Sequence, residues 1–293
     1  MGMERNAGAG PRDEHIVDIL IAERAPRLHA SPAWPLLRPA LYRILDYRSA
    51  RTMADAIAPL GGYAAMDFAS RLLRLDLTVT GAARIPARGR VCILANHPTG
   101  LADGVAVYDA VKPARPDVMF FANSDAHRIN PRLGEIFIPV EWVPQKRTRE
   151  RTRLTLQLAN AAIENERPLV IFPAGAISTP GRAHRLIDPP WQPTAVSLAR
   201  KHAAPVLPVH VEGPWSHLFN AFHRLAGVLP WSREMRDITL FHELLNKAGK
   251  PFRVVVGPPI APQALEGEAT QVTAALKAYI EQVLPEEPDQ PFA

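Results

Sequence analysis

The sequence predicts an α/β protein with a largely parallel central sheet covered by helices on both faces, preceded by an N-terminal helical segment. From about residue 74 onward, short apolar runs rich in branched residues alternate with stretches long enough for helices. This alternation is typical of parallel strands that are buried on both faces. The composition, 47% hydrophobic and 22% charged over 293 residues, is that of an ordinary globular chain able to bury one large core.

The elements follow one another without an internal repeat or a clear linker. Residues 1–13 are expected to form a disordered lead, 14–73 a helical segment, 74–284 the α/β domain, and 285–293 a loose tail. Within the α/β domain the pattern predicts strands at 75–81, 91–95, 118–123, 136–140, 169–172, 205–213 and 252–260, and helices at 102–111, about 150–166, 192–202 and 269–283.

Two apolar helical stretches leave a choice between packing and membrane contact. Residues 34–51 are basic and amphipathic and carry Trp34, Tyr42 and Tyr47, which suits a membrane interface. A helix packed on the main domain explains the same pattern, since most amphipathic helices do only that. Residues 214–231 present the same two alternatives. Aromatic residues at their ends slightly favour the interface.

The remaining composition restricts the class of protein. No apolar stretch at the start resembles a secretory signal, and none is long enough to span a bilayer, so we expect any membrane attachment to be peripheral. A net charge of +5 fits an anionic membrane surface, phosphorylated substrates or nucleic acid about equally well. No nucleic-acid-binding motif is visible, so no nucleic acid partner is expected. The one cysteine, Cys92, lies in an apolar run and is interpreted as a core residue.

The first candidate site follows the apolar run 91–95, where the chain reads Asn96-His97-Pro98-Thr99-Gly100 and reaches Asp103. In open α/β sheets, ligands gather beyond the carboxyl ends of strands. An imidazole there can act as a general base if a carboxylate fixes its tautomer, a role open to Asp103. The alternative is an ordinary strand-to-helix turn with a capping aspartate. We include Asn96, Thr99 and Gly100 as candidate substrate-binding residues.

A second turn follows the apolar run 169–172 and reads Pro173-Ala174-Gly175, with Ser178 and then Arg182 downstream. Small residues after a strand leave backbone N–H groups free to meet an anion or a developing oxyanion. An arginine such as Arg182 could hold a phosphate or carboxylate. The alternative is an ordinary glycine turn. We predict that Pro173, Ala174, Gly175, Ser178 and Arg182 bind substrate.

A basic segment, 145–153, precedes the helix expected at about 150–166. Its residues Lys146 and Arg147 are predicted to contact phosphates or anionic headgroups, and a solvated helix start is the alternative. A metal site formed by His97, Asp125 and His127 is a weaker hypothesis, because no further ligands cluster around them. Ser178 as a nucleophile is weaker still, because no nucleophile elbow surrounds it.

The ordered set Asn96-His97, Asp103, Phe172-Pro173-Ala174-Gly175 and 205–209 resembles the lysophospholipid acyltransferase family, over roughly residues 75–262. The segments 198–213 and 242–260 are similar to its ornithine-lipid or haemolysin-like branch. Most of the family has four residues between the histidine and the aspartate, and this chain has five. The glutamate that usually stands beside the third-motif glycine is replaced here by Ala174 and Ala176.

The resemblance implies that His97 is the general base and Asp103 its partner. It implies transfer of an acyl group from acyl-CoA or acyl carrier protein, as co-substrate, to the hydroxyl of a lyso-lipid, with no metal or other cofactor. It also implies a cytoplasmic protein, peripheral on an anionic membrane surface at the inner face of the cytoplasmic membrane. The missing glutamate suits an acceptor without glycerol phosphate. The alternative is a lipid-binding protein that kept the fold and lost catalysis.

Overall fold

The computed structural model describes residues 14–141, 146–180, 186–214, 220–221, 234 and 238–293. Its centre is a seven-stranded sheet in the order β1-β9-β8-β2-β5-β3-β4. All neighbouring pairs are parallel except β8 and β9. The predicted α/β class with a largely parallel sheet is therefore confirmed.

Every expected strand is present, and each boundary differs from the expectation by only a few residues. The strands are β1 (Asp76–Thr80), β2 (Cys92–Ala95), β3 (Met119–Asn123), β4 (Phe137–Val140), β5 (Leu169–Ile171), β8 (Val206–Glu212) and β9 (Pro251–Val256). A small antiparallel pair, β6 (Thr179–Pro180) and β7 (Leu186–Ile187), was not expected. A strand of two residues is too short to show the alternating pattern by which a strand is recognised in a sequence.

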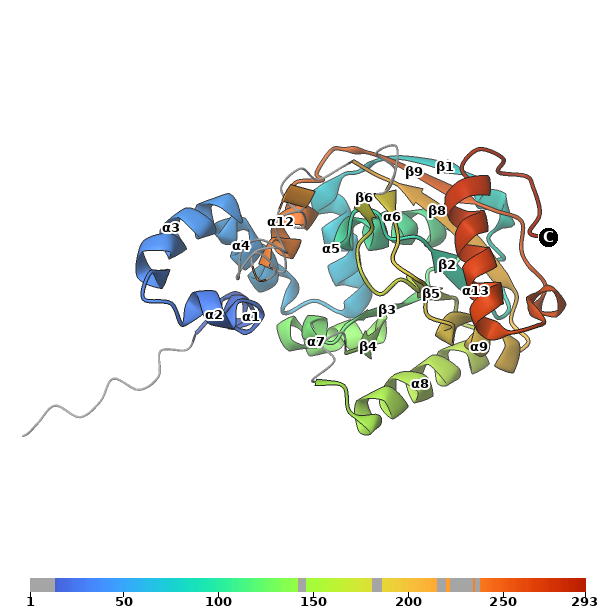
Figure 1. Ribbon diagram of the computed structural model, residues 1–293, viewed down its shortest axis with the longest axis horizontal. Helices are drawn as coiled ribbons and strands as arrows, with labels where there is room; N and C mark the ends of the chain where they lie inside the picture. The colour runs from blue at the N-terminus through green and yellow to red at the C-terminus, as the bar shows by residue number, and fades with distance from the viewer. Residues whose placement is uncertain (1–13, 142–145, 181–185, 215–219, 222–233, 235–237) are drawn as a thin grey trace, which may run out of the picture.

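Helices cover both faces of the sheet (Figure 1). Successive residues of the central strand β2 point to opposite faces. Ile93 and Ala95 pack under one set of helices, whereas Cys92 and Leu94 pack under the other. This double burial explains why the strand reads as a continuous apolar run. The first set is α5 (Gly62–Leu73) and α6 (Leu101–Val111); the second is α8 (Arg149–Glu164), α9 (Thr194–Lys201) and α13 (Ala269–Ala278), which continues as a π-helical turn over Tyr279–Val283.

The four remaining N-terminal helices pack around their own apolar cluster, beside the short helix α12 (Leu240–Leu245) (Figure 1). Trp34 lies inside this cluster, and the hydroxyls of Tyr42 and Tyr47 both donate to Asp18. For these three aromatic side chains the structure therefore agrees with the packing alternative, because they join helices to one another. These helices are α1 (Ile16–Arg24), α2 (Pro26–His29), α3 (Trp34–Ile44) and α4 (Tyr47–Ile57).

A different face of α3 is apolar and exposed. Leu36 is 84% exposed, Ile44 48% and Leu37 40%, while Arg38 and Arg43 are exposed on the same helix. Exposed leucine and isoleucine beside arginine are the composition of an interfacial helix. Within the described residues, no helix is long and apolar enough to cross a membrane.

Ion pairs connect the N-terminal segment to the edge of the sheet where the strands β3 and β4 end. Arg24 binds Asp125 at 3.0 Å, and Glu23 accepts from Arg128 at 2.8 Å and from Lys146 at 3.0 Å. The hydrogen bond from Arg128, with Lys146 beside it, lowers the pKa of Glu23 to about 2. Asp125 and Arg128 lie on α7 (Asp125–Ile129), which directly follows β3.

The C-terminal tail packs on the domain, in contrast to the loose tail expected from its composition. Arg84 binds Asp289 and also donates to the carbonyl of Pro288 at 2.8 Å. Phe292 packs edge-on against Tyr279. Arg253 also donates to the Pro285 carbonyl, and the Tyr279 hydroxyl donates to the Gln290 carbonyl. The composition of this proline-rich, acidic stretch does not indicate these contacts. The lead 1–13 and most of the apolar stretch 214–231 lie outside the described residues.

The buried central strand generates a stability prediction. Ile93 is fully buried between β8 and β5, so Ile93→Ala should lower the free energy of unfolding by about 2–5 kcal/mol. Leu36→Ala, at an exposed position, is the matched control and should change it by less than about 0.5 kcal/mol. Urea denaturation followed by circular dichroism measures both, and equal effects would contradict this assignment of the core.

Candidate active site

His97 lies just beyond the carboxyl end of the central strand β2, where a tight turn leads into helix α6. Its imidazole is 17% exposed, so it lies at the surface of a largely buried turn. The neighbouring residues Asn96, Thr99 and Asp103 are all buried. Parallel strands that end together bring their following turns to one edge of the sheet. The strand β5 pairs directly with β2, so the turn that follows Phe172 is the neighbour of His97.

The Asp103 side chain is fully buried, and four donors surround its carboxylate. One oxygen lies 2.9 Å from His97 Nδ1 and also accepts from the N–H groups of Thr99 and Gly100, each at 2.9 Å. The other oxygen accepts from the Thr99 hydroxyl at 2.6 Å. A buried carboxylate needs such partners to offset the loss of water. Asp103 therefore both caps α6 and holds the imidazole.

Two contacts fix the imidazole ring in its orientation. The Nδ1 atom faces the Asp103 carboxylate, and the Phe172 ring stacks on the imidazole with centroids 4.5 Å apart. Among the described residues, Nε2 has no hydrogen-bond partner. A carboxylate at Nδ1 favours the tautomer with its proton on Nδ1, which leaves Nε2 free to accept a proton.

Gly100 allows the turn to bring the two loops together. Its φ of +95° and ψ of −139° are accessible only to glycine. A Cβ at this position would lie 2.8 Å from Ile177 Cδ1, so the glycine also lets the loop after β5 pack against the start of α6. The Ser178 N–H donates to the His97 carbonyl at 2.9 Å, which closes the contact between the loops.

The loop after β5 offers backbone donors near the imidazole. Within the described part of the chain, the N–H groups of Ala174, Ala176 and Ile177 donate to no protein acceptor, whereas the Gly175 N–H donates to the Phe172 carbonyl at 3.1 Å. The N–H groups of Thr99 and Gly100 are both used by Asp103. Donors for an oxyanion are therefore available in the loop after β5. Within the described residues the N–H groups of Leu101 and Ala102 at the start of α6 also donate to no acceptor, whereas those of Thr99 and Gly100 are used.

Two of the predicted binding residues, Asn96 and Ser178, use their polar side-chain atoms in hydrogen bonds within the protein. Asn96 is buried, its amide N–H donates to the Val211 carbonyl at 2.9 Å and its oxygen accepts from the Val211 N–H at 2.6 Å. It thus extends the pairing of β2 with β8. Ser178 is buried and its hydroxyl donates to Asp188. Direct substrate contact by these two side chains is not favoured by this geometry.

Asp188, which follows β7, was not found by sequence reasoning. Its buried carboxylate accepts from the His97 backbone N–H at 3.1 and 3.2 Å, from the Ser178 hydroxyl, and from Trp191 Nε1 at 2.9 Å. Burial raises the pKa of Asp188, an effect that the Ser178 and Trp191 hydrogen bonds and the nearby imidazole oppose. In the sequence Asp188 stands between Ile187 and two prolines and belongs to no recognisable motif. Its contact with His97 becomes visible only in the folded chain.

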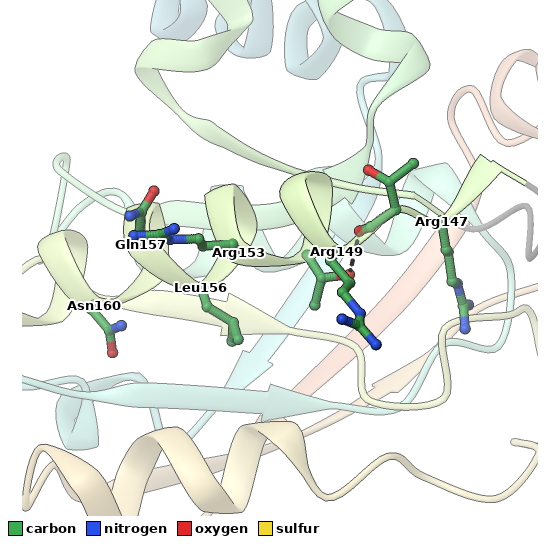
Figure 2. Close-up of a pocket in the computed structure, with 8 residues that line it drawn as sticks. Arg147, Arg149, Arg153, Leu156, Gln157 and Asn160 are labelled. Atoms are coloured by element: carbon green, nitrogen blue, oxygen red, sulfur yellow. Dashed lines mark hydrogen bonds between the residues drawn. The ribbon is translucent and has the colours of Figure 1, made fainter.

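Lys146 and Arg147 lie on the same edge of the sheet but apart from His97. They follow β4, which is three strands from β2, or about 14 Å at the usual strand spacing. Lys146 is paired with Glu23, and Arg147 donates to the Glu141 carbonyl at 2.9 Å. Beyond them, Arg149 and Arg153 line an open hollow of about 590 Å³ along α8 (Figure 2).

Three hypotheses from the sequence remain: binding by Arg182, a metal site around His127, and a core role for Cys92. Arg182 lies outside the described residues. No group of three or more histidine, cysteine, aspartate or glutamate side chains suited to a metal occurs among the residues that are described. Burial lowers the pKa of His127. Cys92 is fully buried, which raises the pKa of its thiol to about 12 and makes it a core residue.

Comparison with known proteins gives three findings. A family model described as acyltransferase matches residues 55–284. A lyso-glycine lipid O-acyltransferase from Phocaeicola vulgatus is 25% identical over 199 residues, covering 68% of this chain and 69% of that protein, and one from Bacteroides thetaiotaomicron is 24% identical over 200 residues, covering 68% and 71%. The crystal structure of the 1-acyl-sn-glycerophosphate acyltransferase PlsC from Thermotoga maritima aligns over 92% of this chain and 95% of that chain, with 16% identity and a TM-score of 0.46.

Two glycines four residues apart should respond oppositely to alanine. Gly100→Ala should lower the free energy of unfolding by about 1–3 kcal/mol, because alanine does not adopt its backbone angles and its Cβ would meet Ile177. Gly104→Ala should raise it by about 0.5–1 kcal/mol, because Gly104 lies inside α6 and a Cβ added there would meet no neighbouring atom within 4 Å. Thermal and urea unfolding measure both, and the same sign for the two would contradict the geometry of the turn.

Proposed function

The chain belongs to the acyltransferase family, and on that premise we propose that it moves a fatty acyl group from a thioester donor to the hydroxyl of a lyso-lipid. The observation that carries the proposal is the His97–Asp103 pair, with the carboxylate 2.9 Å from Nδ1 and Nε2 unpartnered among the described residues. A positioned imidazole of this kind supplies the general base that an alcohol needs to attack a carbonyl at neutral pH.

In the proposed reaction, His97 Nε2 takes the proton of the acceptor hydroxyl as its oxygen attacks the thioester carbonyl carbon. Asp103 holds the imidazole in the required tautomer and stabilises the imidazolium that forms. The tetrahedral intermediate then expels the thiol sulfur, which receives the proton from Nε2. The acyl ester and a free thiol leave, His97 returns to its starting state, and the mechanism forms no acyl-enzyme.

We assign the oxyanion to the loop after β5. The N–H groups of Ala176 and Ile177 donate to no acceptor in the described part of the chain. The Ile177 side chain packs against Gly100, which keeps this loop beside the turn that carries His97. Donors of this kind, fixed before the reaction, stabilise the negative charge that develops on the carbonyl oxygen.

For the acceptor we propose a lyso-lipid of the amino-acid type, such as a lyso-ornithine or lyso-glycine lipid. The curated relatives bear the name lyso-glycine lipid O-acyltransferase. In this chain Ala174 and Ala176 flank Gly175, so these positions provide no charged side chain. This suits an acceptor without glycerol phosphate.

For the donor we propose acyl-CoA or acyl carrier protein, with its phosphates near the N-terminus of α8. Arg147, Arg149 and Arg153 line the hollow there (Figure 2). Guanidinium groups bind phosphate well. The strand β4, which leads to these arginines, lies about 14 Å from β2, so a flexible pantetheine arm would have to bridge the distance to His97.

We further propose that the protein lies on an anionic membrane through the exposed face of α3. Leu36, Leu37 and Ile44 provide the apolar contact, and Arg38 and Arg43 provide the positive charge. Ion pairs from Glu23 and Arg24 hold the neighbouring helix α1 at the sheet edge shared with His97.

Two substitutions should separate catalysis from folding. His97→Ala should lower turnover by about 10²–10⁴-fold and change the free energy of unfolding by less than about 1 kcal/mol, because Asp103 keeps its other donors. Asp103→Ala should lower both, with a stability loss of about 1–3 kcal/mol, because α6 loses its cap.

The assay uses labelled acyl-CoA and acyl carrier protein against lyso-ornithine lipid, lyso-glycine lipid and lysophosphatidic acid, with vesicle sedimentation in parallel. Undiminished turnover by folded His97→Ala would overturn the proposed base. Vesicle binding by the wild type without transfer to any acceptor would favour the lipid-binding protein that lost catalysis. Absence of binding to anionic vesicles would overturn the membrane contact.

A further inference from the structure

We infer that Asp188 is a positioning residue for the reaction, whose buried carboxylate holds the backbone of the general base His97 and the loop after β5 in one fixed arrangement. The inference rests on the proposed function, since it gives Asp188 a role through His97. Asp103 fixes the imidazole ring, whereas Asp188 fixes the peptide that carries the ring. The two carboxylates come from different parts of the chain and act on different parts of one residue.

The donor set of Asp188 joins three segments. The His97 N–H comes from the turn after β2, the Ser178 hydroxyl from the end of the loop after β5, and Trp191 Nε1 from the segment that leads into α9. All three groups are donors, so the carboxylate is the shared acceptor. The loss of this acceptor leaves three buried donors without a partner, which no rearrangement of a single side chain repairs.

The segment around Asp188 also holds the other end of the loop after β5. The Gln192 N–H donates to the Pro173 carbonyl at 3.0 Å, and the Trp191 side chain is buried in the core beneath. The loop is therefore fixed at Pro173 and at Ser178. Between these points lie Ala176 and Ile177, whose N–H groups face no acceptor among the described residues. A shift of Asp188 would move base and oxyanion donors together.

The charged groups near Asp188 are themselves held by other partners. On one side it faces His97, which in turn faces Asp103. On the other side its backbone N–H donates to Glu281 at 2.8 Å, and Glu281 pairs with Lys277 on α13. Lys277 therefore forms its ion pair with Glu281. The groups that donate to the Asp188 carboxylate are neutral: the His97 backbone N–H, the Ser178 hydroxyl and Trp191 Nε1.

The test compares Asp188→Ala with Asp188→Asn. The alanine variant should lower kcat per folded molecule by about 10²-fold, the scale expected when a base is displaced by about 1 Å, with KM for both substrates within about threefold of wild type. The asparagine variant should recover about tenfold of that loss. Its amide oxygen can still accept from His97 and Trp191 while its N–H₂ donates to the Ser178 hydroxyl, although a neutral acceptor binds less strongly than a carboxylate.

Asp117→Asn is the matched control. Asp117 is bound by Arg115 and lies two residues before the start of β3, on the opposite edge of the sheet from His97. It should keep the wild-type kcat per folded molecule even if its thermal stability falls. Wild-type kcat in folded Asp188→Ala, or a change confined to KM, would overturn the inference and leave Asp188 with a purely structural role.

A second readout does not depend on activity. Labelling the ten histidines with ¹⁵N gives a small set of backbone amide signals, and His97→Gln identifies the one from His97. In Asp188→Asn, which preserves the shape of the side chain, the His97 amide proton should move upfield and exchange faster with solvent. An unchanged signal and exchange rate in Asp188→Asn would overturn the inference. This readout remains available if Asp188→Ala fails to fold. Absence of acyl transfer by the wild type would instead overturn the proposed function.

Discussion

The burial of the Asp103 carboxylate is the constraint on which the rest of the site depends. A carboxylate without water must be surrounded by donors, and here the donors are the imidazole of His97, the hydroxyl and N–H of Thr99, and the N–H of Gly100. Satisfying them forces the chain into a tight turn that only glycine at position 100 permits. The same bonds begin helix α6. Helix capping and orientation of the His97 imidazole are therefore one interaction, so the two explanations of the His-Asp spacing do not exclude each other.

The parallel sheet explains how distant segments meet at this turn. Because β2 and β5 are neighbours that run in the same direction, the turn after each lies at the same edge. Phe172 then stacks on the imidazole and Ile177 packs against Gly100. Asp188 adds a third segment that holds both turns from beneath. Shared hydrogen bonds with two buried carboxylates thus connect the three short loops to one another.

The sequence predicts the sheet well and the support of the site poorly. Strands buried on both faces read as short apolar runs, which is why the seven strands of the main sheet were expected. The pairing of His97 with Asp103 follows from spacing and turn chemistry within seven residues. Asp188 was missed because its partners are distant in sequence. For α3 the sequence leaves packing and membrane contact open, because periodicity shows which residues share a side and does not show which side is buried. In the structure Trp34 faces the neighbouring helices and Leu36 faces solvent.

The central claim is that Asp103 sets the tautomer of His97 so that Nε2 can take a proton. The most direct measurement is the imidazole ¹⁵N spectrum of histidine-labelled protein at a pH where His97 is neutral, compared with Asp103→Asn. The account predicts a protonated Nδ1 and an unprotonated Nε2 for His97 in the wild type, and loss of this preference in the variant. A proton on Nε2 of wild-type His97 would contradict the account, because the atom assigned to accept the hydroxyl proton would already carry one.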